Sequence, residues 1–174
     1  MSANARTIRS ESRLAIARGV PEVWDYICDV GCWPEWAPTV QECWVGGGAP
    51  LAPGARVEQR AKLMFGLTRR RSQQVTAVEA PRSLAFAGPL GTSTGRWGMK
   101  FAPIDGGRTE AKMWVEVDLR NIMRALPRRA FKGRIQGVMD IEMAAIKAAV
   151  ESMPRTAPTP DGGSAERSQE ERTR

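Results

Sequence analysis

Three tryptophans crowd a short amphipathic segment, residues 20–40, which lies between two runs that have the alternating pattern of strands. Its sequence, VPEVWDYICDVGCWPEWAPTV, predicts a short helix, a sharp turn and a second short helix. Rings of this size dominate the burial energy of whatever they pack against, so they are not expected in a surface connection. We predict that the segment covers the interior as a lid or wedge. Trp24 is expected to anchor it, which leaves Trp33 and Trp36 able to reach a ligand.

Alternating apolar and polar residues predict strands through most of the middle of the chain. The clearest alternation covers residues 108–119, and residues 92–101 repeat it. The turn sequence between them, PIDGG at 103–107, predicts an antiparallel hairpin. Further strands are predicted at residues 10–16, 40–45, 57–63, 68–79 and 83–88. Seven strands, most of them consecutive, indicate a curved antiparallel sheet.

One long helix is predicted at the end of the domain, over about residues 128–153. Its apolar residues recur every three or four positions, which places them on one stripe. The stripe consists of Ile135, Met139, Met143, Ile146, Val150 and Met153. One face of the sheet and this stripe are expected to bury each other.

Composition indicates a single domain at residues 10–153, with a flexible leader at 1–9 and a disordered tail at 154–174. The tail is rich in Pro, Gly, Ser and Thr and its charges cancel, so the net charge of +7 belongs to the rest of the chain. The N-terminus lacks the apolar core of a secretory signal, and no apolar run reaches the length of a membrane span. We therefore expect a cytoplasmic protein.

The absence of histidine excludes many enzyme classes, because it removes the usual general base and the usual zinc ligand. Cys28, Cys32 and Cys43 match no common zinc or redox spacing and are expected to be buried thiols. The three glycines at 46–48 fit a flexible hairpin connection rather than a phosphate-binding loop. We expect no metal site and no cofactor, and the sequence assigns no catalytic residue.

The order of elements and two motifs are shared with a known superfamily. The motifs are V-W-x-x-x-x-D-x-x-x-W-x-x-W, from Val23 to Trp36, and Ala80-Pro-Arg-Ser-Leu84 after the fourth strand. Residues 10–153 thus resemble the START/polyketide cyclase (SRPBCC, Bet v 1-like) superfamily. The resemblance implies an α+β helix-grip fold: a curved seven-stranded antiparallel sheet wraps around a long C-terminal helix. Two short helices after the first strand would complete the wall of an internal cavity.

An apolar cavity with a few polar groups is the expected form of a small-molecule site. On the middle strands, period two turns Gln59, Arg71 and Gln73 inward if the neighbouring valines are core residues. The predicted lining consists of Trp33, Trp36, Gln59, Arg71, Gln73, Trp97, Met99, Phe101, Met113, Val115, Met139 and Met143. Arg71 is the sharpest candidate for a polar anchor, since its planar fork holds an anion, a carbonyl or a phenolate. A one-residue register shift would instead expose it, and core packing is the alternative for the aromatic residues and methionines.

Residues 120–134 are basic and amphipathic and contain no acid. In helix-grip proteins this segment rims the cavity mouth, where it could meet an anionic membrane surface or attract an acidic ligand. A solvated basic surface is the alternative, and nucleic acid is not expected because no groove-reading motif is present. The basic residues are Arg120, Arg124, Arg128, Arg129, Lys132 and Arg134.

Three functions remain open at the level of the sequence. The first is binding of a hydrophobic small molecule, such as a lipid, a polyketide or another aromatic metabolite, in the internal cavity. The alternative is a polyketide cyclase, dehydrase or aromatase-like enzyme, in which an arginine or a tyrosine polarises a carbonyl. A membrane- or ribosome-associated interaction module is a third.

Overall fold

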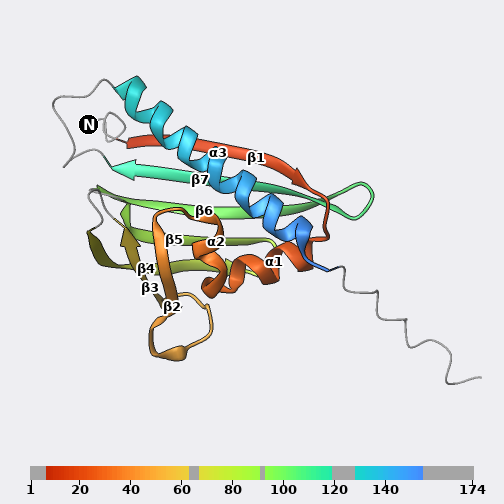
Figure 1. Ribbon diagram of the computed structural model, residues 1–174, viewed down its shortest axis with the longest axis horizontal. Helices are drawn as coiled ribbons and strands as arrows, with labels where there is room; N and C mark the ends of the chain where they lie inside the picture. The colour runs from red at the N-terminus through yellow and green to blue at the C-terminus, as the bar shows by residue number, and fades with distance from the viewer. Residues whose placement is uncertain (1–6, 63–66, 91–92, 119–127, 155–174) are drawn as a thin grey trace, which may run out of the picture.

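The computed structural model describes residues 7–62, 67–90, 93–118 and 128–154 (Figure 1). The elements are β1 (Thr7–Ile16), α1 (Val20–Cys28), the 3₁₀ turn η2 (Val30–Cys32), α2 (Trp33–Trp36), β2 (Val40–Val45), the 3₁₀ turn η3 (Gly46–Gly48), β3 (Arg56–Lys62), β4 (Thr68–Glu79), β5 (Ser83–Leu90), β6 (Ser93–Ile104), β7 (Arg108–Asp118) and α3 (Arg128–Ser152).

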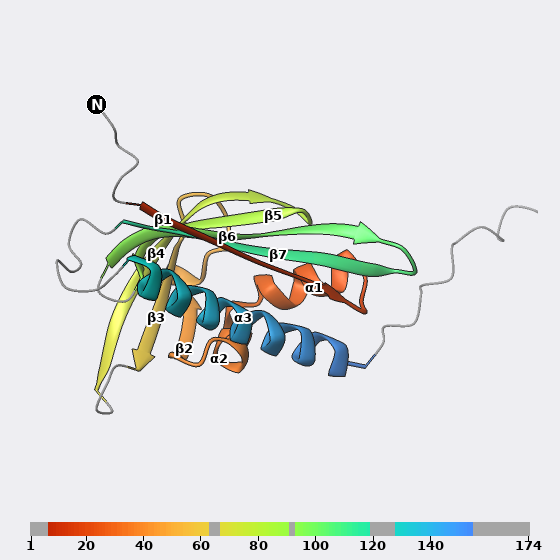
Figure 2. The same ribbon diagram turned by 90° about the horizontal axis from the view of Figure 1, so that it is seen from above.

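The seven strands form one antiparallel sheet in the order β1-β7-β6-β5-β4-β3-β2. Strands β2 to β7 are a meander, and β1 closes the series by pairing with β7. Figure 2 shows that the sheet is curved and that α1, α2 and α3 all lie on its concave side. This arrangement confirms the predicted helix-grip architecture.

The predicted boundaries hold closely, because each strand is bounded by turn residues that the sequence displays. β2 and β4 have the predicted limits, and α3 ends one residue early. β1 begins at Thr7 rather than Ser10, so residues 7–9, which were assigned to the leader, pair with residues 116–118 of β7. The rest of the leader and the tail from residue 155 lie outside the described residues.

The long helix packs along β1, and both apolar and polar contacts hold it there. Met139, Met143, Ile146 and Val150 are buried, as the stripe predicted. Polar contacts run along the edge: Ser12 Oγ donates to Asp140 Oδ1 at 2.7 Å, and a lysine of α3, Lys147, donates to the carbonyl of Ala15 at 2.6 Å. These contacts set the position of α3 relative to β1. The side of α3 away from these contacts faces the other strands.

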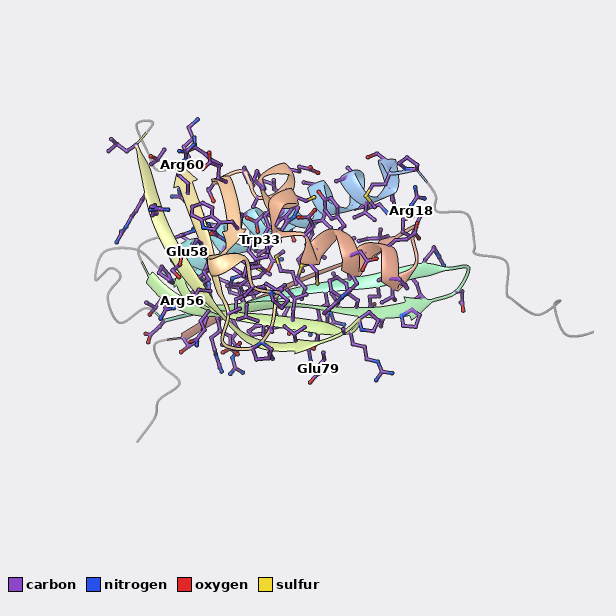
Figure 3. All side chains as sticks on the ribbon, turned by 90° about the horizontal axis from the view of Figure 1, so that it is seen from below. Arg18, Trp33, Arg56, Glu58, Arg60 and Glu79 are labelled. Atoms are coloured by element: carbon purple, nitrogen blue, oxygen red, sulfur yellow. The ribbon has the colours of Figure 1, made fainter. Side chains whose placement is uncertain are left out.

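The tryptophan-rich segment forms α1, η2 and α2, as predicted, but the residue that anchors it is different. Trp33, which is 1% exposed, donates from Nε1 to the carbonyl of Ile27 at 2.9 Å. Its ring meets those of Trp36, Phe86 and Trp97 at centroid distances of 5.3 to 5.6 Å. Figure 3 shows Trp33 between the helices and the sheet.

Trp24 is only partly buried and meets the edge of Phe101, with ring centroids 6.1 Å apart. The expectation that Trp24 anchors the segment is therefore corrected in favour of Trp33. The reason is that α2 packs against both α3 and β2, which encloses Trp33.

Candidate functional site

A polar row crosses the concave face of three neighbouring strands. Cys43 of β2 pairs with Gln59 of β3, which pairs with Arg71 of β4. Gln59 is 2% exposed, and Arg71 donates from Nε to Gln59 Oε1 at 2.5 Å. Burial raises the pKa of the Cys43 thiol to about 12, so this member of the row stays neutral. The strand register thus brings together three polar side chains from separate parts of the sequence.

Gln73 also faces inward, but its hydrogen-bonding groups are already used. Trp97 donates from Nε1 to Gln73 Oε1 at 2.8 Å, while Gln73 Nε2 donates to the carbonyl of Pro89 at 3.4 Å. Trp97 is stacked on Phe86 at a centroid distance of 4.5 Å. This amide therefore locks β4 to β5 and β6 and has little left to offer a ligand.

Arg71 differs from Gln73 because part of its guanidinium is left open. Nε is bonded to Gln59, but neither terminal nitrogen has a hydrogen-bond partner among the described residues. Burial lowers the pKa of Arg71, while the charge of Glu142 opposes that shift. An arginine remains charged under such shifts, so two donor nitrogens are available in a half-buried position.

Glu142 of α3 is the residue that the sequence analysis missed. Burial raises the pKa of this carboxyl to about 7, and the Arg71 charge acts against the rise. A signal for it existed: Glu142 follows Met139 by three residues and precedes Ile146 by four, so it lies on the apolar stripe of the helix. The predicted stripe consists of apolar residues alone, so it does not include Glu142.

The apolar lining candidates are all buried in one cluster on the concave side of the sheet. On the ladder, Trp97 pairs with Val115 and Met99 with Met113, so these four form a patch. Phe101 lies four positions after Trp97 on β6, where it packs under α1, and it does not join the polar row. The buried set is Trp33, Trp36, Trp97, Met99, Phe101, Met113, Val115, Met139 and Met143.

One indole adds a further open donor. Trp36 is buried, yet its Nε1 has no hydrogen-bond partner in the described part of the chain. A buried N–H without a partner costs about 1–3 kcal/mol. Its partner is therefore expected to be a water molecule or a ligand group.

The basic segment of residues 120–134 is described only in part. Arg120 and Arg124 lie outside the described residues, as does the side chain of Arg128, the first residue of α3. Arg129, Lys132 and Arg134 are exposed on the first turns of α3. These three cations are the part of the basic segment on which an argument can rest.

A depression of about 310 Å³ lies apart from the polar row, where β5, β6 and β7 meet outside the core. Its rim carries charges of both signs, including Glu79, Lys100 and Glu110. Figure 3 shows Glu79 pointing away from the helices. An open, charged depression is a poor match for an apolar ligand. The interior polar row is the better candidate site.

The described residues contain no group of three or more Cys, Asp or Glu side chains arranged to hold a metal ion. Among the helices described, none combines the length and the apolar character needed to cross a membrane.

Comparison with known proteins agrees with the fold. No curated protein matches the chain in sequence. A START superfamily protein from Mycobacterium smegmatis is 13% identical, with a TM-score of 0.66 over 82% of this chain and 97% of that one. Ara h 8.0201 is 16% identical, with a TM-score of 0.65 over 84% of this chain and 99% of that one.

The family model described as "Polyketide cyclase / dehydrase and lipid transport" matches residues 7–151, which is nearly all of the folded part. That span includes every strand and almost all of α3. The chain therefore belongs to this polyketide cyclase / dehydrase and lipid transport family, and it shares the fold of the START superfamily protein and of Ara h 8.0201.

Proposed function

We propose that the protein binds a hydrophobic small molecule, such as a lipid, a polyketide or another aromatic metabolite, between the concave face of the sheet and α3. The family and the fold supply a scaffold for hydrophobic ligands. The observation that carries the proposal is the open hydrogen-bonding capacity of Arg71 and Glu142 on the inner side of an otherwise apolar layer. Packing alone would not need charged groups at these half-buried positions.

The expected affinity follows from the burial of apolar surface. A ligand that buries about 300 Å² of apolar area gains roughly 7 kcal/mol at about 25 cal/mol per Å². Costs of association of several kcal/mol leave binding in the micromolar to millimolar range from shape alone. Polar contacts with the open groups would then provide specificity and bring affinity into the micromolar range.

Titration with the neutral apolar fluorophore N-phenyl-1-naphthylamine tests the proposal. We expect saturable 1:1 binding with a dissociation constant of about micromolar. Met139→Gln places an amide on the buried side of α3 and should weaken binding about tenfold. Ile141→Gln, on the same helix at a side chain 61% exposed, is the matched control and should leave it unchanged.

Circular dichroism and urea unfolding of both variants separate a loss of site from a loss of fold. Native mass spectrometry of the purified protein should in addition show a retained apolar compound. The proposal is wrong if the folded wild-type protein neither binds the fluorophore saturably nor carries such a compound. If Met139→Gln and Ile141→Gln weaken fluorophore binding equally, the fluorophore binds on the surface and not in the interior.

An enzyme of the cyclase type is the second candidate, supported by the opposed Arg71 and Glu142. A carboxyl whose pKa is about 7 exchanges protons readily near neutral pH, as a general acid or base must. Arg71 offers donors to a carbonyl oxygen. Tyr26 does not fit this role as well, because its hydroxyl already donates to Glu35 Oε2 at 2.8 Å.

Intramolecular aldol cyclisation of 2,6-heptanedione is a simple test of this second candidate. Glu142 would take the proton from the carbon beside one carbonyl, and the resulting enolate would attack the other carbonyl. The alkoxide oxygen formed there would then take the proton from Glu142. Loss of water then gives a conjugated enone that is followed by absorbance. Acceleration that Glu142→Gln abolishes would support an enzyme. No acceleration by a protein that binds the fluorophore would leave binding as the sole activity.

A further inference from the structure

The apolar face of α3 is interrupted by a carboxylate at its middle. Met139, Met143 and Ile146 surround Glu142 in sequence and are buried to 4% exposure or less. A structural role for an acid in such a place would be a direct ion pair or a hydrogen bond within the protein. Neither is found for Glu142 among the described residues.

Arg71 is the charged group that acts on Glu142, yet the two side chains form no direct contact. Each one perturbs the titration of the other, but they form no direct ion pair. Arg71 keeps its Nε on Gln59 and leaves its terminal nitrogens open. The layer between β4 and α3 thus presents donors on one side and an acceptor on the other, with no protein group that joins them.

The remaining groups around this space do not complete the pair. From β2, the titratable neighbour is Cys43, a neutral thiol. From α2, Glu35 is exposed and accepts from Tyr26. β1, which packs along α3, presents serines there, and Ser12 is bound to Asp140 on another flank of the helix. No described residue therefore joins Arg71 to Glu142.

We propose that the site selects apolar ligands that carry a neutral hydroxyl group, alcoholic or phenolic, whose oxygen accepts from Arg71 and whose O–H donates to the Glu142 carboxylate. This rests on the proposed function, since it specifies the ligand of the same site. A single hydroxyl satisfies both sides at once, because it is both donor and acceptor. It also adds no charge to a pair that is neutral overall, whereas a ligand carboxylate would add an unbalanced negative charge.

The titration of Glu142 agrees with this choice. With a pKa of about 7, the carboxyl is largely ionised in mildly basic solution and accepts the hydrogen bond of the ligand. Protonation at lower pH removes the charge from that hydrogen bond and weakens it. A carboxylate ligand would behave in the opposite way, because it would need Glu142 protonated and would bind more tightly as the pH falls.

Three probes that share one apolar body distinguish these ligand classes: naphthalene, 2-naphthol and 2-naphthoate. Each is measured by displacement of N-phenyl-1-naphthylamine from the full-length protein. We expect 2-naphthol to bind about tenfold more tightly than naphthalene at pH 8, as hydrogen bonds to charged groups would give. Its affinity should fall about threefold at pH 6, while that of naphthalene stays constant.

Variants tie the preference to the two residues. Glu142→Gln and Arg71→Met should each bring 2-naphthol to within about twofold of naphthalene and remove the pH dependence. Glu110→Gln and Arg69→Met change the same residue types at exposed positions and should retain the preference. If Arg71→Met fails to fold, Arg71→Lys keeps the charge and should retain part of the preference.

The outcomes separate this inference from the function on which it rests. Equal affinity for all three probes overturns the hydroxyl preference and leaves hydrophobic binding standing. Tightest binding of 2-naphthoate, stronger at pH 6 than at pH 8, overturns it in favour of an anion site. A preference that survives in both Glu142→Gln and Arg71→Met also overturns it. Failure of the fluorophore itself to bind removes the proposed function.

Discussion

One buried arginine and one half-buried arginine show how the neighbours of a charge decide what it does. Arg18, 8% exposed, donates from one terminal nitrogen to the carbonyls of Glu151 and Met153, the first of these at 2.9 Å. Its Nε lies 3.5 Å from Glu22 Oε1. Figure 3 shows it beside the C-terminal end of α3. A cation at a helix C-terminus stabilises carbonyls that have no partner within the helix. Arg18 is thus structural, whereas Arg71 has donors to spare.

Replacing Arg18 should therefore cost stability rather than binding. Arg18→Met leaves the terminal carbonyls of α3 without this donor, and we expect a loss of about 2–4 kcal/mol in the free energy of unfolding. Urea unfolding followed by circular dichroism measures it. Arg13→Met is the control, because Arg13 is exposed and pairs only with Glu11, and it should change stability by less than about 1 kcal/mol. Similar losses in the two variants would contradict the role given to Arg18.

At the scale of elements, close approach between strands depends on glycines of β6, and Gly98 is one of them. A Cβ placed on Gly98 would lie 2.5 Å from the carbonyl oxygen of Leu84 on β5 and 2.8 Å from the indole of Trp114 on β7. The indole thus covers a backbone that has no side chain of its own. Alternation along β6 predicted the strand, but not the ring that lies over it.

Two alanine substitutions should change stability in opposite directions. Gly98→Ala forces Trp114 or the β5 backbone to move, and we expect a loss of about 1–3 kcal/mol in the free energy of unfolding. Gly137→Ala lies on an exposed side of α3, where a Cβ meets nothing within 4 Å, and should stabilise by about 0.5–1 kcal/mol. Thermal unfolding of both variants measures the difference. Stabilisation by Gly98→Ala would show that the β6 contact is loose.

At the scale of the whole molecule, the half-buried carboxyl of Glu142 links stability to pH. The pKa of Glu142 is about 7 in the folded protein against 4.5 as its ordinary value. Between these values the folded state holds a proton that the unfolded state has released, so stability falls as the pH rises through this window. The loss should be on the order of 2–3 kcal/mol and complete above pH 7.

Unfolding free energies of the wild-type protein and Glu142→Gln, measured in urea from pH 4.5 to pH 8, isolate this effect. Hydrogen bonds and ion pairs lower the pKa of Glu11 and of Glu151, which removes stability as the pH falls. Both proteins share that contribution. As the pH rises from 4.5 to 7, we expect the free energy of unfolding of the glutamine variant to increase relative to that of the wild type. Parallel curves would show that Glu142 is fully solvated.

The exposed surface of α3 also bears on partners of the whole molecule. Arg129, Lys132 and Arg134 are exposed cations, and Val138 and Ile141 are exposed apolar residues further along the same helix. This combination suits an anionic membrane surface. We expect sedimentation with phosphatidylglycerol vesicles that weakens with added salt, and that is lost when the three cations are changed to glutamine.

A matched triple variant controls for the overall positive charge. Arg56, Lys62 and Arg69 are exposed on β3 and β4, away from α3, and their change to glutamine lowers the net charge by the same amount. Only the variant on α3 should lose vesicle binding. Equal losses in the two triple variants would show attraction by net charge alone, and binding that salt does not weaken would contradict the membrane proposal.

The fold was accessible from the sequence because its signals are local. Period two placed β2 and β4 at their observed limits, and the spacing of Met139, Met143 and Ile146 placed the buried side of α3. The same periodicity turned Gln59 and Gln73 inward, where both are buried. A side chain two positions from a core valine on the same strand lies on the same face as that valine, so these orientations need no knowledge of distant contacts.

By itself the sequence determined the elements, their order and the face on which each residue lies. Only the tertiary structure decided which polar groups remain free. Gln73 and Arg71 are equivalent in pattern, but Trp97 takes up the amide of Gln73, whereas Arg71 is left facing Glu142. The physical reason is that hydrogen-bond satisfaction depends on partners brought together from distant strands and from the last helix, and periodicity carries no information about such pairs.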